Sequence, residues 1–165
     1  MRKRSAIAAA LAAGTLAALV TAAPAQATEY SSALKIKAVQ YDAPGPDSNR
    51  CSGGNTAAEY VTIKNYSSTA TVNLKGYTVR DAVGNSYTFR INHYLQPGDY
   101  VRLRGNYGTE SDANNVAYRN NCNFIWNNDR DTIKLIKPGG AYADVHSYTK
   151  SGNDADGNGY ISFHS

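Results

Sequence analysis

Residues 59–81 read EYVTIKNYSSTATVNLKGYTVRD, and this stretch decides the fold. Val61 and Ile63 alternate with more polar neighbours, which is the period-two pattern of a strand with one buried face. After a polar turn, shorter alternating runs follow at 71–74 and 77–80, with a glycine between them. The stretch therefore predicts three strands joined by turns, and it contains no constellation of reactive side chains.

The rest of the chain repeats this pattern at intervals of about ten residues. Further strands are expected at 34–39, 86–89, 100–104, 116–118, 132–136 and 142–148. The turn at Gly84 and Asn85 predicts a hairpin between two of the strands. No helical periodicity occurs after residue 27, so we expect an all-β fold, an antiparallel sandwich or barrel.

Residues 1–27 have the three parts of a secretory signal peptide. A basic start at 2–4 precedes an uncharged apolar run, Ala6–Val20, and a small-residue cleavage site at 25–27. The alternative is a membrane anchor, but the apolar run is shorter than the ~20 residues that span a bilayer. We therefore expect cleavage after Ala27 and a secreted, extracellular protein with no membrane span.

Removal of the signal peptide changes the charge of the chain. Residues 1–27 hold three of the seventeen Lys and Arg residues and none of the thirteen acidic ones, which leaves fourteen against thirteen, a net charge of +1. The basic pI of about 9.0 is therefore no sign of nucleic-acid binding. The length predicts one domain at 28–150 with a single core, followed by a polar, flexible tail at 151–165.

The chain has two cysteines, Cys51 and Cys122, both after the signal peptide. In an oxidising compartment we expect them to form a disulfide. Such a bond would stabilise the fold by about 2–4 kcal/mol, because it restricts the unfolded chain. The alternatives are two free thiols or a metal site, although the sequence lacks the close cysteine pairs that a metal site needs.

Five segments of the chain form an ordered set. They are EYVTIKN at 59–65, LKGYTVRD at 74–81, YTF at 87–89, LQPGDYV at 95–101 and WNNDRDTIKL at 126–135. Over residues 34–148 their order and spacing resemble the lamin tail domain, which occurs at the C-terminus of nuclear lamins and in many exported bacterial proteins. The resemblance implies an immunoglobulin-like antiparallel β-sandwich and a non-enzymatic accessory or adhesive module of the bacterial secreted type.

The chain departs from the lamin pattern in three respects. Tyr77 stands where the family often has Trp, a change that keeps an aromatic side chain for the core. The coiled-coil rod of a lamin is missing, so filament assembly is not implied. The signal peptide also makes nuclear partners unexpected.

A binding surface is expected among the outward residues of two strands. Tyr100, Arg102 and Arg104 alternate along one strand, and Lys35 and Lys37 along another. If these strands are neighbours, the side chains form a basic, partly aromatic patch for a phosphate-rich wall polymer or nucleic acid, of which nucleic acid is not favoured. The alternative is that the charges serve solubility and protect strand edges.

Trp126 lies beside apolar residues in an Asn-rich loop. It is a candidate platform on which a sugar ring would stack. The alternative, which the family resemblance favours, is an aromatic plug in the core.

Residues 154–161, DADGNGYI, copy the first part of an EF-hand loop. Asp154, Asp156 and Asn158 would supply oxygen ligands to Ca²⁺. The last position of the loop is Ser165 instead of a bidentate glutamate, so binding would be weak, millimolar or worse. The alternative is a flexible turn without metal, and no other cofactor is expected.

No catalytic residues are expected. Asp144 and His146 share one strand face and could orient a base, and the alternative is a solvated strand edge. The enzyme alternative is an extracellular hydrolase with an unfamiliar carboxylate site. It requires a histidine to converge with Asp129, Asp131 or Asp144.

Together these features predict a secreted, non-enzymatic binding, adhesion or structural module. Its partner would be a cell-envelope polymer or another protein, and a protein could dock on an exposed sheet edge. Besides the hydrolase, a weak Ca²⁺-binding surface protein is an alternative.

Overall fold

The computed structural model describes residues 30–45, 47, 55–121, 123 and 125–164. Short strands dominate this part of the chain. In order they are β1 (Leu34–Gln40), β2 (Tyr60–Asn65), β3 (Val72–Asn73), β4 (Thr78–Arg80), β5 (Ser86–Thr88), β6 (Tyr94–Leu95), β7 (Tyr100–Arg104), β8 (Val116–Tyr118), β9 (Arg130–Ile136), β10 (Tyr142–Thr149) and β11 (Tyr160–Ser162). Helix in the described part of the chain is limited to a 3-10 turn, η1 (Asn55–Ala57), and one helical turn, α1 (Lys150–Asn153).

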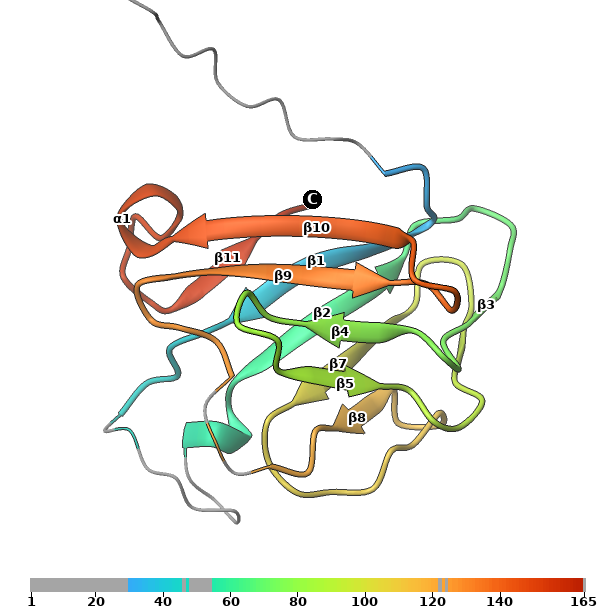
Figure 1. Ribbon diagram of the computed structural model, residues 1–165, viewed down its shortest axis with the longest axis horizontal. Coiled ribbons are helices and arrows are strands. Elements are labelled where there is room, and N and C mark those ends of the chain that lie inside the picture. Colours follow the sequence, from blue (N-terminus) through green and yellow to red (C-terminus); the bar gives the residue numbers. More distant parts are fainter. Residues whose placement is uncertain (1–29, 46, 48–54, 122, 124, 165) are drawn as a thin grey trace, which may run out of the picture.

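The strands form two layers, which Figure 1 shows one in front of the other. The five-stranded sheet has the order β11-β1-β2-β7-β8, and the four-stranded sheet has the order β10-β9-β4-β5. β3 and β6 pair separately. The pairs are antiparallel, except that β7 and β8 run parallel. The all-β antiparallel sandwich expected from the sequence is confirmed.

The core is built from the apolar residues of the alternating strands. Val61 and Ile63 of β2 and Val101 and Leu103 of β7 are each at most 1% exposed. They join Ile133 of β9, from the other sheet, in one buried cluster. Complete burial of such a side chain contributes about 1.5–3 kcal/mol, so this cluster fixes which face of each strand points outward.

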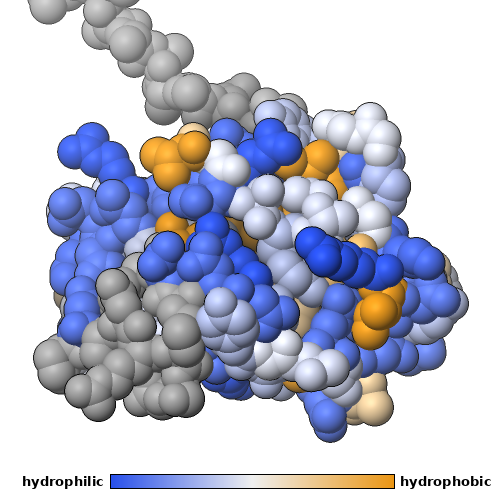
Figure 2. Space-filling view, turned by 60° about the horizontal axis from the view of Figure 1, so that its bottom comes forward, coloured by the Kyte–Doolittle hydropathy of each residue, from blue (hydrophilic) through white to orange (hydrophobic). Residues whose placement is uncertain are grey.

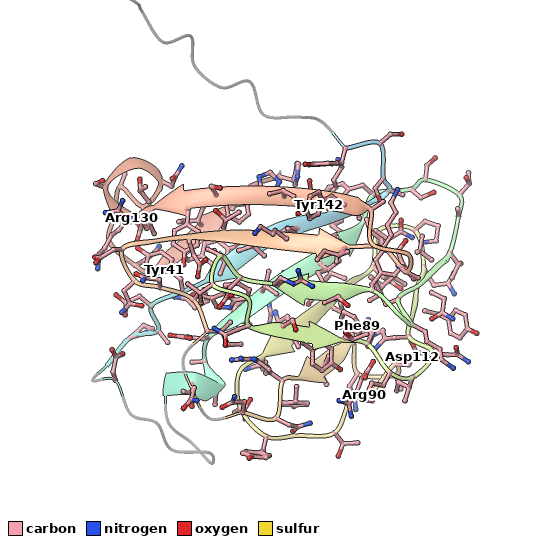
Figure 3. The ribbon with its side chains drawn as sticks, viewed as in Figure 1. Tyr41, Phe89, Arg90, Asp112, Arg130 and Tyr142 are labelled. Carbon is pink, nitrogen blue, oxygen red and sulfur yellow. The ribbon has the colours of Figure 1, made fainter. Side chains whose placement is uncertain are left out.

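The segment 151–164 does not form the flexible tail that its polar composition predicts. β11 pairs with residues 38–40 of β1, and Ile161 is only 4% exposed. The Tyr41 hydroxyl donates a 2.5 Å hydrogen bond to Asp154, and Figure 3 labels Tyr41 on the side of the molecule where α1 lies. The sequence signal is weak because β11 has three residues, too few to show a period, and its partner strand lies far away in the sequence.

Several expectations concern residues outside the described part of the chain. They include the signal peptide at 1–27 and both cysteines of the expected disulfide, Cys51 and Cys122, so export and the disulfide stay predictions. Among the residues that were described, no helix has the length and apolar character needed to cross a membrane.

Candidate functional site

The outward residues of β2 and β7 form one continuous face of the five-stranded sheet. The register places Tyr60 opposite Arg104 and Lys64 opposite Tyr100, with Arg102 between them on β7. Since side chains alternate in step on paired strands, all five lie on the same side of the sheet. We call Tyr60, Lys64, Tyr100, Arg102 and Arg104 the cationic face.

Contacts between arginine and tyrosine hold the cationic face together. The Arg102 guanidinium lies 5.0 Å from the centre of the Tyr60 ring and 5.5 Å from that of the Tyr100 ring. Arg104 lies 5.8 Å from the Tyr60 ring and donates a 2.8 Å hydrogen bond to the carbonyl of Ala57. Such cation–π contacts are worth about 0.5–1 kcal/mol at exposed sites. They position the positive charges without neutralising them.

A groove of about 340 Å³ borders the cationic face. Its walls combine Tyr100, Arg102 and Arg104 with Asp99 and the loop residues 113–115. The Nε atom of Arg102 is buried and has no hydrogen-bond acceptor among the described residues. No acidic side chain of the described chain forms an ion pair with Arg102 or Arg104. Arg102 and Arg104 therefore line the groove without a carboxylate partner among the described residues, although the Nε atom of Arg102 itself is covered.

Lys35 contributes less to this surface than the sequence suggests. Lys35 and Lys37 lie on β1, which is next to β2 but not to β7, and Lys35 pairs with Lys64 of β2. The Lys35 ammonium donates a 2.6 Å hydrogen bond to the carbonyl of Tyr30 and lies 3.9 Å from Asp144. The expected patch thus forms around β7. The lysine that lies next to Tyr100 in it is Lys64 of β2 and not Lys35.

Trp126 is a core residue. It is 2% exposed and belongs to the main apolar cluster. The loop around it is held by Asp131, whose carboxylate accepts a 3.2 Å hydrogen bond from the backbone N–H of Asn127. A sugar-stacking platform is therefore the wrong interpretation, because burial leaves no free ring face.

The EF-hand-like segment uses its oxygens within the protein. Asp154 accepts hydrogen bonds from the Tyr41 hydroxyl and from the backbone N–H of Gly159 at 2.9 Å. The bond from Tyr41 lowers the pKa of Asp154. The side chain of Asn158 donates a 2.8 Å hydrogen bond to Asp156. These bonds stabilise the turn between α1 and β11, and binding of Ca²⁺ there stays a prediction.

Asp144 bonds to a stretch of β1 that β11 leaves unpaired. β11 covers only residues 38–40 of β1, and the Ile36 N–H beyond it donates a 2.8 Å hydrogen bond to Asp144 Oδ2. Asp144 is 4% exposed, so the solvated strand edge considered for it is wrong. Burial raises the pKa of Asp144, but hydrogen bonds from His146 and Ile36 and the charges of His146 and Lys35 lower it more, to below its ordinary value.

Two histidines converge on this carboxylate. The Nε2 atoms of His146 and His164 lie 3.2 Å and 3.5 Å from Asp144 Oδ2 and 3.0 Å from each other. His164 follows β11, where the Phe163 N–H donates a 2.8 Å hydrogen bond to the carbonyl of Lys37. The Phe163 ring stacks on His146 with centroids 4.5 Å apart. Within the described residues this is the one group of three side chains that could hold a metal ion.

Comparison with known protein families identifies most of the chain. The family model described as Lamin Tail Domain matches residues 27–150. The chain belongs to the lamin tail domain family. This confirms the resemblance drawn from the ordered segments and the immunoglobulin-like form of the sandwich. A comparison with curated proteins gives no match.

Lamin tail domains are immunoglobulin-like structural modules that are generally non-enzymatic. The sandwich of this lamin tail domain continues past the matched residues, because β11 completes the five-stranded sheet. The face drawn in Figure 2 is mainly hydrophilic, and its apolar residues form small separate patches. A large apolar patch is the usual mark of an apolar docking surface. The patches on this face are small, so contacts made through it would be mainly polar.

Sequence reasoning missed three members of these sites. Tyr60 and Lys64 carried a usable signal, because they alternate with the buried Val61 and Ile63 and must point outward on β2. His164 carried none, because its place depends on the pairing of β11 with β1.

Proposed function

We propose that this lamin tail domain is an exported, non-enzymatic binding module whose cationic face binds an anionic cell-envelope polymer. Family membership supports a non-enzymatic module in general. The finer proposal depends on one observation. The Arg102 guanidinium lies against two tyrosine rings, with no carboxylate partner among the described residues.

Phosphate is the anion that suits this face best. A guanidinium presents its N–H donors in a planar fork that matches phosphate oxygens. Arg102 and Arg104 are two positions apart on β7, which spaces them by about 7 Å along the strand. Tyr100 is 42% exposed and offers a ring to the sugar or glycerol between phosphates. A repeating polyanion would contact several of these groups at once.

The test is calorimetric titration of the purified protein with a soluble glycerol-phosphate polymer at low and high salt. Arg102→Ala should weaken binding at least tenfold, since a charge-assisted hydrogen bond is worth about 1.5–3 kcal/mol. Arg80→Ala is the matched control, because it removes the same charge from an exposed position on β4 of the other sheet. Equal affinities of the two variants, or no binding at low salt, would refute the proposal.

A hydrolase is the second candidate function. The observation that favours it is the convergence of His146 and His164 on Asp144, which the enzyme alternative requires. A panel of phosphoester, ester and glycoside substrates tests it. Turnover that disappears in His146→Phe would support a hydrolase, and absence of turnover on every substrate class would count against it.

A further inference from the structure

The triangle formed by Asp144, His146 and His164 does not suit hydrogen bonds alone. Its corners are Oδ2 and two Nε2 atoms, and all three edges are between 3.0 Å and 3.5 Å. The two shorter edges, at 3.0 Å and 3.2 Å, have hydrogen-bond length, and both end on Nε2 of His146. Each Nε2 atom, however, carries either a proton or a lone pair, not both.

No placement of protons satisfies the three edges together. If both Nε2 atoms carry protons, the two N–H groups face each other across 3.0 Å. If only one Nε2 atom is protonated, the lone pair of the other faces the carboxylate oxygen. If Asp144 is protonated, its one proton reaches only one imidazole, and whether or not an Nε2 atom also carries a proton, at least one edge is left without one. A cation resolves all three edges, because it accepts a lone pair from every corner.

The dimensions of the triangle fit a transition metal. Ligands of a tetrahedral zinc ion lie about 2.0–2.1 Å from the metal and hence about 3.3 Å from one another. The three edges, 3.0, 3.2 and 3.5 Å, bracket that separation. A point at the zinc–ligand distance from all three atoms lies just outside the plane of the triangle, so the spacing of the three atoms already suits the ion.

The surroundings hold the three ligand atoms in place. The Ile36 N–H donates to Asp144, the Phe163 ring stacks on His146, and the Tyr66 ring meets His164 edge-on at 5.6 Å. The Tyr66 hydroxyl is buried without a hydrogen-bond partner among the described residues. Burial of an unpaired hydroxyl is unfavourable, and it lies on the ring that contacts His164.

We propose that Asp144, His146 and His164 form a binding site for a divalent first-row transition metal ion, with Zn²⁺ as the probe. Imidazole and carboxylate ligands suit zinc, whereas Ca²⁺ and Mg²⁺ require oxygen ligands. The side chains of His146 and His164 are 24% and 28% exposed, so an ion reaches them from solvent. Three protein ligands leave one position of the ion open to water. The site shares no residue with the cationic face, although the Tyr66 ring lies against both Lys64 of that face and His164.

The experiment is isothermal titration of untagged, chelator-treated protein with Zn²⁺, followed by Co²⁺ substitution and optical spectroscopy. We expect one ion per chain with micromolar or tighter affinity, and the visible bands of four-coordinate Co²⁺. His146→Phe keeps a ring against Phe163 without a nitrogen, and His164→Ala removes the other imidazole. Each should weaken zinc binding by at least ~10–100-fold, the loss known for removing even an outer partner.

Ser147→Ala is the control, because Ser147 is exposed on β10 beside His146 and its hydroxyl contacts that of Thr132 on the neighbouring strand, away from the three ligand atoms. It should bind zinc like the unchanged protein. Circular dichroism of each variant shows that it has folded. No zinc uptake by the unchanged protein would overturn the proposal, and so would uptake that survives both histidine substitutions. The latter result would place the ion elsewhere, for example at the cysteines.

Discussion

Replacing Glu59 with Gln tests how the core tolerates a buried acid. Glu59 is 2% exposed and directly precedes β2, and its Oε2 atom has no hydrogen-bond partner among the described residues. Burial raises the pKa of Glu59 from 4.5 to about 8, against a backbone hydrogen bond from Ile125 that lowers it. The charges of Asp47 and Asp42 add to the rise. The folded protein therefore keeps this carboxyl group protonated at neutral pH.

The direction of the pH effect follows from where each state releases the proton. The unfolded chain releases it near pH 4.5, and the folded protein holds it up to about pH 8. Between these values the folded state binds more protons, so the free energy of unfolding falls as pH rises. One pKa unit corresponds to about 1.4 kcal/mol, so above pH 8 the free energy of unfolding is lower by about 5 kcal/mol than below pH 4.5 as far as this group is concerned. Glutamine keeps the shape and the acceptor for the Ile125 N–H but cannot ionise.

Urea unfolding across the range from pH 5 to pH 9 measures the effect, with the fluorescence of the single, buried Trp126 as the probe. Glu59→Gln and the unchanged protein should be similar in stability near pH 5, and the variant should be more stable by several kcal/mol at pH 9. Asp129→Asn removes an exposed carboxylate and should change stability by less than about 0.5 kcal/mol throughout. A difference between Glu59→Gln and the unchanged protein that stays constant with pH would refute the reasoning.

Three further variants test the folded state of the segment 151–164. Tyr41→Phe removes the hydroxyl that donates to the buried Asp154, and thermal unfolding should show a loss of about 1–3 kcal/mol. Gly159 has a φ of +73°, and a Cβ there would collide with the backbone of Asp42. Gly159→Ala should therefore lower Tm more than Tyr41→Phe does, and an unchanged Tm would contradict this close approach. A chain that ends at residue 150 should unfold at lower urea concentration, because β11 no longer covers β1; an equal midpoint would mean that β11 contributes nothing to stability.

Local patterns in the sequence predicted the parts of the fold that depend on near neighbours. Val61 and Ile63 alternate with polar residues because one face of β2 is buried, and both are fully buried in the structure. The hairpin of β4 and β5 was visible in its turn, where Asp81 accepts hydrogen bonds from the backbone of Gly84 and Asn85. The same alternation placed Arg102 on the outer surface of the sheet.

Features that depend on distant pairing were not visible in the sequence. Nothing near residue 160 indicates that it pairs with β1, and the place of His164 follows from that pairing alone. Asp144 looked like an exposed strand residue because the sequence does not show that the Ile36 N–H lacks a strand partner. The polar composition of 151–165 suggested a flexible tail. It does not show that polar side chains of this segment bond to the rest of the protein, as Asp154 does to Tyr41.

The geometry of the sheet edge explains why the carboxylate and the two imidazoles lie together. β11 leaves the Ile36 N–H uncovered, and a carboxylate from β10 takes that bond while remaining buried. A buried carboxylate is stable only with cationic or hydrogen-bonding partners, and Lys35, His146 and His164 lie within 4.0 Å of it. The ligand atoms are thus fixed by strands that the fold needs in any case. An ion at this point would bind a preformed site, and it would stabilise the folded state because the unfolded chain does not bring the three residues together.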